Sequence, residues 1–225
     1  TETFVSIRGL VALAAIGAIG AIGSASAGFA QPAPHGGQFQ VNTYTTGSQG
    51  VPAVAVDPLG RMLVVWVSGL ETGDQQWGLR GQLYAADGST QGAPFQVNNA
   101  TTGNQQWPSI AASADGDFVV VWDSTFSTGS DSAGYSIQGR RFASDGTPLG
   151  IDFQVNTYTT SNQRFSAVAT DGDGEFVVVW QSYGSGGGDT LGESVHGQRF
   201  SAARVPQGAE FQVNTTTYSS QIAGG

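Results

Sequence analysis

Residues 176–182 read FVVVWQS, and this stretch decides the fold class of the chain. Its Phe, Val and Trp side chains stand on consecutive positions, a pattern typical of a β-strand that is buried on both faces. A closely similar stretch, FVVVWDS, occupies residues 118–124, and MLVVWVS occupies residues 62–68. The sequence therefore predicts three equivalent strands, each lying in a sheet that is stacked between other sheets.

A second motif recurs around these strands at intervals of roughly sixty residues. Phe-Gln-Val-Asn begins at Phe39, Phe95, Phe153 and Phe211, and a Gln follows ten residues after each of these Phe residues. Internal periodicity of this length is typical of propeller blades or solenoid units. It divides the chain into repeats 43–98, 99–156 and 157–214, with a tail of 215–225.

Each repeat is expected to contain four antiparallel strands joined by Asp-Gly and Asp-Pro turns. The first three strands of the repeats are predicted at 52–56, 62–68 and 79–84, at 108–112, 118–124 and 137–142, and at 166–170, 176–182 and 195–200. The fourth strand is Phe-Gln-Val-Asn itself, with Phe and Val inward and Gln and Asn outward. The predicted fold class is all-β, with three four-stranded, propeller-blade-like repeats preceded by a hydrophobic N-terminal helix.

The order of FQVN, FVVVWxS, GxRF and again FQVN resembles a tandem repeat of large exported or surface proteins of bacteria. The resemblance covers residues 39–225 and implies propeller-like sheets and an extracellular or cell-surface setting. That family has no settled activity, so the resemblance implies no catalytic residues.

The N-terminal segment 1–30 allows two interpretations, and residues 31–38 form a linker to the repeats. Residues 9–30 carry no charge, follow Arg8, and end in small residues at Ala25-Ser26-Ala27. These features are typical of a secretory signal peptide. The same span is long enough to cross a bilayer as a retained helix, in which case it would be the chain's contact with a membrane.

Composition excludes several classes of function. The formal net charge is −9, and all eight basic residues are Arg. An acidic surface repels phosphate backbones, so nucleic acid is not expected as a partner. The absence of cysteine excludes a disulfide framework, a thiol nucleophile and Cys-ligated zinc.

Three repeats are fewer than closed propeller rings usually have, so the ends of the array need a cover. A six-bladed ring of two chains, a closed threefold arrangement of one chain and end-to-end stacking of subunits would each provide one. The leading strand Phe39, Gln40, Val41 and Asn42 has no repeat of its own and could pair with a sheet edge of a neighbouring molecule. We expect the protein to self-associate as a homo-oligomer or filament.

Two groups of residues are candidates for binding. The loops between the second and third strands should emerge on one rim and carry the aromatic residues Trp77, Phe126, Tyr135 and Tyr183, which could bind glycans; plain solvated hairpin tips are the simpler alternative. Asp171, Asp173 and Glu175 alternate as the oxygen ligands of a Ca²⁺ ion do. The simpler interpretation of these carboxylates is a hairpin turn.

No catalytic constellation can be named, because the chain has only His35 and His196 as histidines and its carboxylate pairs are unremarkable for an acidic β protein. The sequence therefore predicts that the protein is not an enzyme. The leading hypothesis is a non-catalytic extracellular structural or adhesive protein that self-associates. The alternative hypothesis is a secreted, lectin-like carbohydrate-binding module.

Overall fold

The computed structural model describes residues 37–69, 76–126, 128–184 and 192–215. These residues contain no helix, and hence no helix that could cross a membrane. The hydrophobic segment 1–30 lies outside the described residues, as does most of the tail 215–225. The contacts divide the chain into residues 1–40 and 41–225, and every strand belongs to the second unit.

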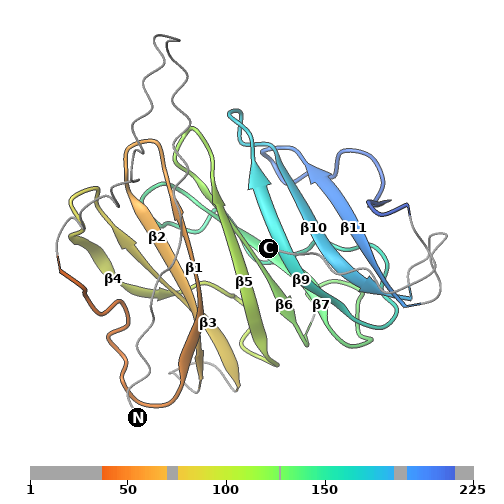
Figure 1. Cartoon of the computed structure of the whole chain (residues 1–225), viewed down its shortest axis with the longest axis horizontal. Helices are drawn as coiled ribbons and strands as arrows, with labels where there is room; N and C mark the ends of the chain where they lie inside the picture. The colour runs from red at the N-terminus through yellow and green to blue at the C-terminus, as the bar shows by residue number, and fades with distance from the viewer. Residues whose placement is uncertain (1–36, 70–75, 127, 185–191, 216–225) are drawn as a thin grey trace, which may run out of the picture. The chain divides into compact units, whose positions relative to one another are not determined.

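The strands form three antiparallel sheets of four strands, each in sequential order, which confirms the predicted all-β class (Figure 1). Strand bounds are β1 Gln49–Val56, β2 Met62–Gly69, β3 Trp77–Tyr84 and β4 Thr90–Gln96; β5 Gln105–Ala112, β6 Phe118–Ser124, β7 Ser136–Phe142 and β8 Phe153–Gln154; β9 Gln163–Thr170, β10 Phe176–Tyr183, β11 Glu193–Phe200 and β12 Phe211–Gln212. The third sheet pairs its strands in the order β9, β10, β11 and β12, as the first two sheets do.

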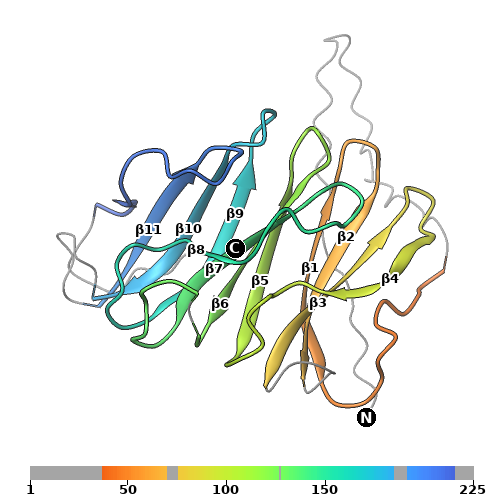
Figure 2. The ribbon, with the colours of Figure 1, turned by 180° about the vertical axis from the view of Figure 1, so that it is seen from behind.

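The sheets lie in a row with the second sheet between the other two. Strand β5 lies between β1 and β9 in both views of the ribbon, and β5 contacts both of them (Figure 2). The Val-rich strand β6 is buried along its whole length. Its Val120 and Trp122 pack against the first sheet, whereas Val119 and Val121 pack against the third. Burial on both faces therefore follows from the consecutive apolar positions, as the sequence predicts.

The recurring Gln of each repeat has a structural partner in the first two sheets. The indole Nε1 of Trp122 donates a hydrogen bond of 2.8 Å to Oε1 of Gln105, and Trp66 donates one of 3.2 Å to Gln49. A buried indole N–H needs an acceptor, and the Gln at the start of the first strand supplies it. The Trp thus explains the Gln of the first two repeats. In the third sheet, Oε1 of Gln163 accepts from Nδ2 of Asn156 at 3.4 Å, and Nε1 of Trp180 has no partner among the described residues.

The fourth strands differ from the prediction. The ladder at β8 and β12 includes only the Phe and Gln of the motif. Residues 39–42 form no strand within this chain, and their predicted pairing with a neighbouring molecule stays a prediction. The Asn side chain is also buried rather than outward. The Oδ1 atoms of Asn98 and Asn156 accept the N–H groups of Leu79 and Ile137, at 2.7 and 2.8 Å. Side-chain amides therefore replace the last backbone bonds of the ladder, which ends the strand early.

Candidate functional site: an aromatic cluster between the second and third sheets

The first strand of every sheet carries a β-bulge two residues after its start. The register of β1, β5 and β9 shifts at this point, and Val51, Trp107 and Phe165 adopt positive φ angles of 47°, 53° and 56°. Large side chains avoid this conformation, and bulges commonly turn a side chain toward a functional surface. The three side chains are 38%, 42% and 39% exposed. Each bulge therefore holds a large apolar side chain in contact with solvent.

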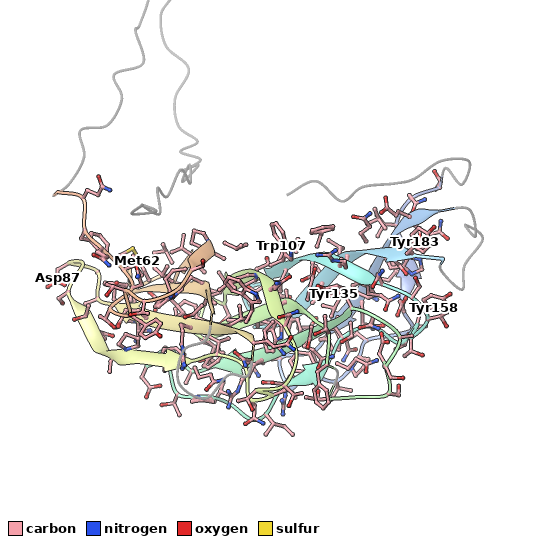
Figure 3. The ribbon with its side chains drawn as sticks, turned by 90° about the horizontal axis from the view of Figure 1, so that it is seen from below. Met62, Asp87, Trp107, Tyr135, Tyr158 and Tyr183 are labelled. Carbon is pink, nitrogen blue, oxygen red and sulfur yellow. The ribbon has the colours of Figure 1, made fainter. Side chains whose placement is uncertain are left out.

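Two of these side chains meet at the junction of the second and third sheets. The rings of Trp107 and Phe165 have centroids 5.5 Å apart at an interplanar angle of 72°. The guanidinium of Arg164 lies over the rings of Phe165 and Tyr135, at 4.7 and 4.3 Å from the centroids. We call these four residues the aromatic cluster; Trp107 and Tyr135 are labelled in Figure 3. The cluster combines ring surfaces with a cation that is 29% exposed.

The buried carboxyl group of Asp123 holds Arg164 and Phe165 of the aromatic cluster in place. Asp123 is the residue after the Trp of β6, and its side chain has no exposed surface. It accepts hydrogen bonds from the backbone N–H of Phe165 at 3.0 Å and from Nε of Arg164 at 3.4 Å. Desolvation by burial raises the pKa of Asp123 to about 7, although these hydrogen bonds and the charge of Arg164 lower it. The first and third sheets have Val67 and Gln181 at this position, so the carboxyl group belongs to the second sheet alone.

An Asn joins neighbouring sheets at the rim beside the aromatic cluster. Asn162 accepts the N–H of Tyr135 on its side chain, at 3.1 Å, and the N–H of Tyr183 on its carbonyl, at 2.9 Å. Asn104 does the same between the first two sheets, where its side chain accepts the N–H of Trp77 and its carbonyl accepts that of Thr125. The starts of the first strands and the loops between the second and third strands therefore share one end of the sheets.

The four aromatic residues that the sequence suggested for binding lie at this end, but only one joins the aromatic cluster. Tyr135 lies beneath Arg164, whereas Trp77 packs against the core between the first two sheets. Phe126 and Tyr183 are 46% and 52% exposed. Trp107 and Phe165 stand at the same position of consecutive repeats and were not predicted as binding residues from the sequence. An aromatic residue at both positions was a visible signal, but the positive φ that turns them outward was not.

The acidic stretch 171–175 forms a tight turn. Oδ1 of Asp171 accepts the backbone N–H groups of Asp173 and Glu175, at 3.0 and 2.9 Å. Such bonds are what an Asp in a turn supplies. Across the described ranges, no three His, Asp or Glu side chains gather as a metal site would require. The structure therefore shows the role of Asp171 in the turn, and calcium stays a prediction.

Comparison with known proteins gives a likeness in structure only. No protein-family model matches the sequence, and no curated protein matches it either. An endo-arabinase from Bacteroides thetaiotaomicron is similar over 68% of this chain and 57% of its own, with 20% identity and a TM-score of 0.42. An endo-1,4-β-xylanase from the same organism is similar over 74% of this chain and 60% of its own, with 12% identity and a TM-score of 0.46. The chain thus spans less than two thirds of the length of either protein.

A GH43 protein from Bacillus licheniformis is similar over 78% of this chain and 44% of its own, with 10% identity and a TM-score of 0.34. The three proteins named here are an endo-arabinase, an endo-1,4-β-xylanase and a GH43 protein, which are glycoside hydrolases by name or class. This finding overturns the prediction that the chain is not an enzyme, which depended only on the lack of a catalytic constellation in the sequence. The likeness itself assigns no reaction to the chain.

Proposed function

We propose that the protein is a carbohydrate-binding, propeller-like module whose glycan contacts are made by the aromatic cluster. The observation that carries the proposal is the exposed pair Trp107 and Phe165, which two bulges hold in a conformation that large side chains avoid. The conformational cost recurs in neighbouring repeats and places two rings at one solvent-facing junction. This favours the carbohydrate-binding hypothesis over a structural or adhesive role.

The chemistry of the aromatic cluster suits a sugar. The face of an aromatic ring is electron-rich and attracts the weakly positive C–H groups on the face of a sugar ring. The edge-to-face arrangement of Trp107 and Phe165 offers two such surfaces at an angle of 72°. The guanidinium of Arg164 carries several N–H donors, which can bond the hydroxyl groups at a sugar's edge. Asp123 acts here as a positioning residue, because its buried carboxyl group fixes the backbone of Phe165 and the side chain of Arg164.

The test is a glycan array, followed by affinity electrophoresis in gels that contain soluble xylan. Trp107→Ala and Phe165→Ala remove one ring each and should lower retention at least about fivefold, because stacking on one aromatic ring contributes on the order of 1 kcal/mol or more. Leu59→Ala is the matched control, since Leu59 is 72% exposed and lies in the turn at the opposite end of β1. This control should bind as the unsubstituted chain does.

Two outcomes would contradict the proposal. The first is an absence of binding to every glycan on the array and to xylan. The second is binding that Trp107→Ala, Phe165→Ala and Leu59→Ala leave equally unchanged. Released reducing sugar should be assayed on every glycan that binds, which shows whether binding is accompanied by hydrolysis.

A further inference from the structure

The outer face of the third sheet is apolar and exposed where the corresponding faces of the other sheets are buried. Val213 is 48% exposed, whereas its counterparts Val97 and Val155 are 0% and 2% exposed. Phe211 packs beside Val179 over Gly197 and is 41% exposed. We call this surface the free face; it comprises Val177, Val179, Phe211 and Val213, with the buried Gln181, which is 6% exposed, next along β10.

The first and second sheets show what such a face binds. On the first sheet, Val65, Val67 and Val97 contact the Phe, Val and Trp of the next sheet, residues Phe118, Val120 and Trp122. On the second sheet, Val119, Val121 and Val155 contact Phe176, Val178 and Trp180 in the same way. The chain therefore makes one kind of face-to-face junction twice. The third sheet presents the first half of that junction again.

A polar contact of the junction also indicates that a further sheet can dock on the third sheet. Asp123 on the second sheet accepts the N–H of the bulge residue Phe165 on the third sheet. Gln181 occupies the equivalent position on the third sheet, and its Oε1 is buried with no hydrogen-bond partner among the described residues. A buried acceptor of this kind destabilises the chain unless a donor reaches it. A bulge N–H from a further sheet would be that donor.

The complementary face exists on the first sheet of the same chain. Val64, Trp66 and Tyr84 form a buried group there, on the side opposite to the second sheet, and Val41 packs against them. Val41 belongs to the first Phe-Gln-Val-Asn motif, and its carbonyl accepts the hydroxyl of Tyr84. Val97 and Val155 pack in the same way on the second and third sheets. The segment around Val41 thus occupies the place that the fourth strand of a preceding sheet would fill.

We propose that the free face docks on the first sheet of a second copy of this chain, head to tail. In this arrangement Val213 of one copy takes the place of Val41 of the other, and both residues come from the same motif. Val51 of the second copy then lies against the third sheet as Phe165 lies against the second sheet. Its backbone N–H would donate to Gln181 as that of Phe165 donates to Asp123. Val41 occupies the same surface of the first sheet within its own chain, so it competes with the second copy and weakens the association. The proposal does not depend on carbohydrate binding.

The test is sedimentation equilibrium of the full chain over a wide concentration range. The unsubstituted chain should associate reversibly. Val213→Asp should weaken the association constant by more than about tenfold, because the docked carboxylate would lose its water without gaining a partner. Phe211→Ala should weaken it in the same direction. Val205→Asp is the matched control, because Val205 is also an exposed Val, at 56%, in the turn after β11.

Val41→Ala separates head-to-tail docking from other modes of association. It weakens the cover of the first sheet and should therefore strengthen association. Trp107→Ala, which removes part of the proposed glycan site, should leave association unchanged. A monomer at every concentration overturns the proposal. So does association that Val213→Asp does not weaken, that Val205→Asp weakens equally, or that Val41→Ala does not strengthen.

Discussion

Val51, Trp107 and Phe165 each adopt an unfavourable backbone conformation that exposes a large apolar side chain. A residue with a Cβ is destabilised by about 1 to 2 kcal/mol in the left-handed region. For a β-branched residue such as Val, this conformation is even less favourable. At Trp107 and Phe165 this unfavourable backbone conformation places two aromatic rings next to each other. Val51 is the bulge residue without a ring, and its side chain is 38% exposed. The strain at this position should therefore be measurable by itself.

Val51→Gly should raise the free energy of unfolding by about 1 kcal/mol, because glycine adopts a positive φ without steric cost. The measurement is urea unfolding followed by circular dichroism. Val56→Gly is the control, since Val56 is 49% exposed, lies at the end of the same strand and does not have a positive φ. That change should lower the unfolding free energy by about 0.5 to 1 kcal/mol, as glycine does within strands. A decrease for both variants would show that the bulge is not strained.

Asp123 should make stability fall as pH rises. Its pKa is about 7 in the folded chain, whereas an unfolded Asp titrates near 4. Between these values the folded carboxyl group keeps a proton that the unfolded one has lost. The folded state therefore binds more protons, and its stability falls with rising pH, by on the order of 4 kcal/mol in total for three pKa units.

Asp123→Asn removes this titration while keeping a side-chain oxygen to accept the N–H of Phe165. The unfolding free energy of the unsubstituted chain, minus that of the variant, should decrease between about pH 4 and about pH 8. Urea titrations of both chains at several pH values give this difference directly. Subtracting the variant cancels the contributions of the other carboxyl groups. A difference that stays constant over this range would show that Asp123 is ionised throughout.

At the scale of the element, each third strand has a glycine where the Phe of the fourth strand crosses it. A Cβ at Gly139 would lie 2.8 Å from the ring of Phe153, and one at Gly197 would lie 2.8 Å from that of Phe211. These distances are shorter than any normal contact between carbon atoms. The recurring Gly and Phe are therefore two halves of one packing motif that closes each sheet.

Gly139→Ala should lower the free energy of unfolding by about 2 kcal/mol, because the added methyl group displaces Phe153 from the core between the second and third sheets. Thermal unfolding followed by calorimetry measures this change. Gly172→Ala is the control, since a Cβ at Gly172 would meet no atom within 4 Å and its φ is not positive. An equal loss in both variants would mean that the ring of Phe153 moves aside without cost.

The elements differ in how far the sequence could predict them. The second strands were predicted to within one residue, because their consecutive apolar side chains are needed on both faces. The fourth strands were predicted to end too late, at Asn98 and Asn156 rather than at Gln96 and Gln154, since the side chain of each Asn takes over a bond that the backbone would otherwise make. The aromatic cluster was predicted only at Tyr135. Its other members depend on a bulge and on the packing of β5 beside β9 of the next repeat, and neither is encoded by local periodicity.

At the scale of the whole molecule, the three sheets are not equivalent although their sequences repeat. The second sheet is covered on both sides, and Val119, Val120, Val121 and Trp122 of β6 are at most 2% exposed. The third sheet is covered by the second sheet on one side, and its free face contains Phe211 and Val213 at 41% and 48% exposure. In repeat arrays, stability is the sum of each unit and its contacts with neighbours. Local opening should therefore be easier in the third sheet than in the second.

Hydrogen exchange followed by mass spectrometry should show this gradient. At low protein concentration, peptides from β6 should exchange slowest and peptides from β10 and β11 markedly faster, because opening the third sheet breaks one junction and opening the second breaks two. Raising the concentration should slow exchange in β10, since a second copy docked on the free face adds the missing junction, while β6 should change little. Equal protection of β6 and β10 at low concentration would mean that the junctions contribute little to stability and that each sheet is held mainly by its own strands.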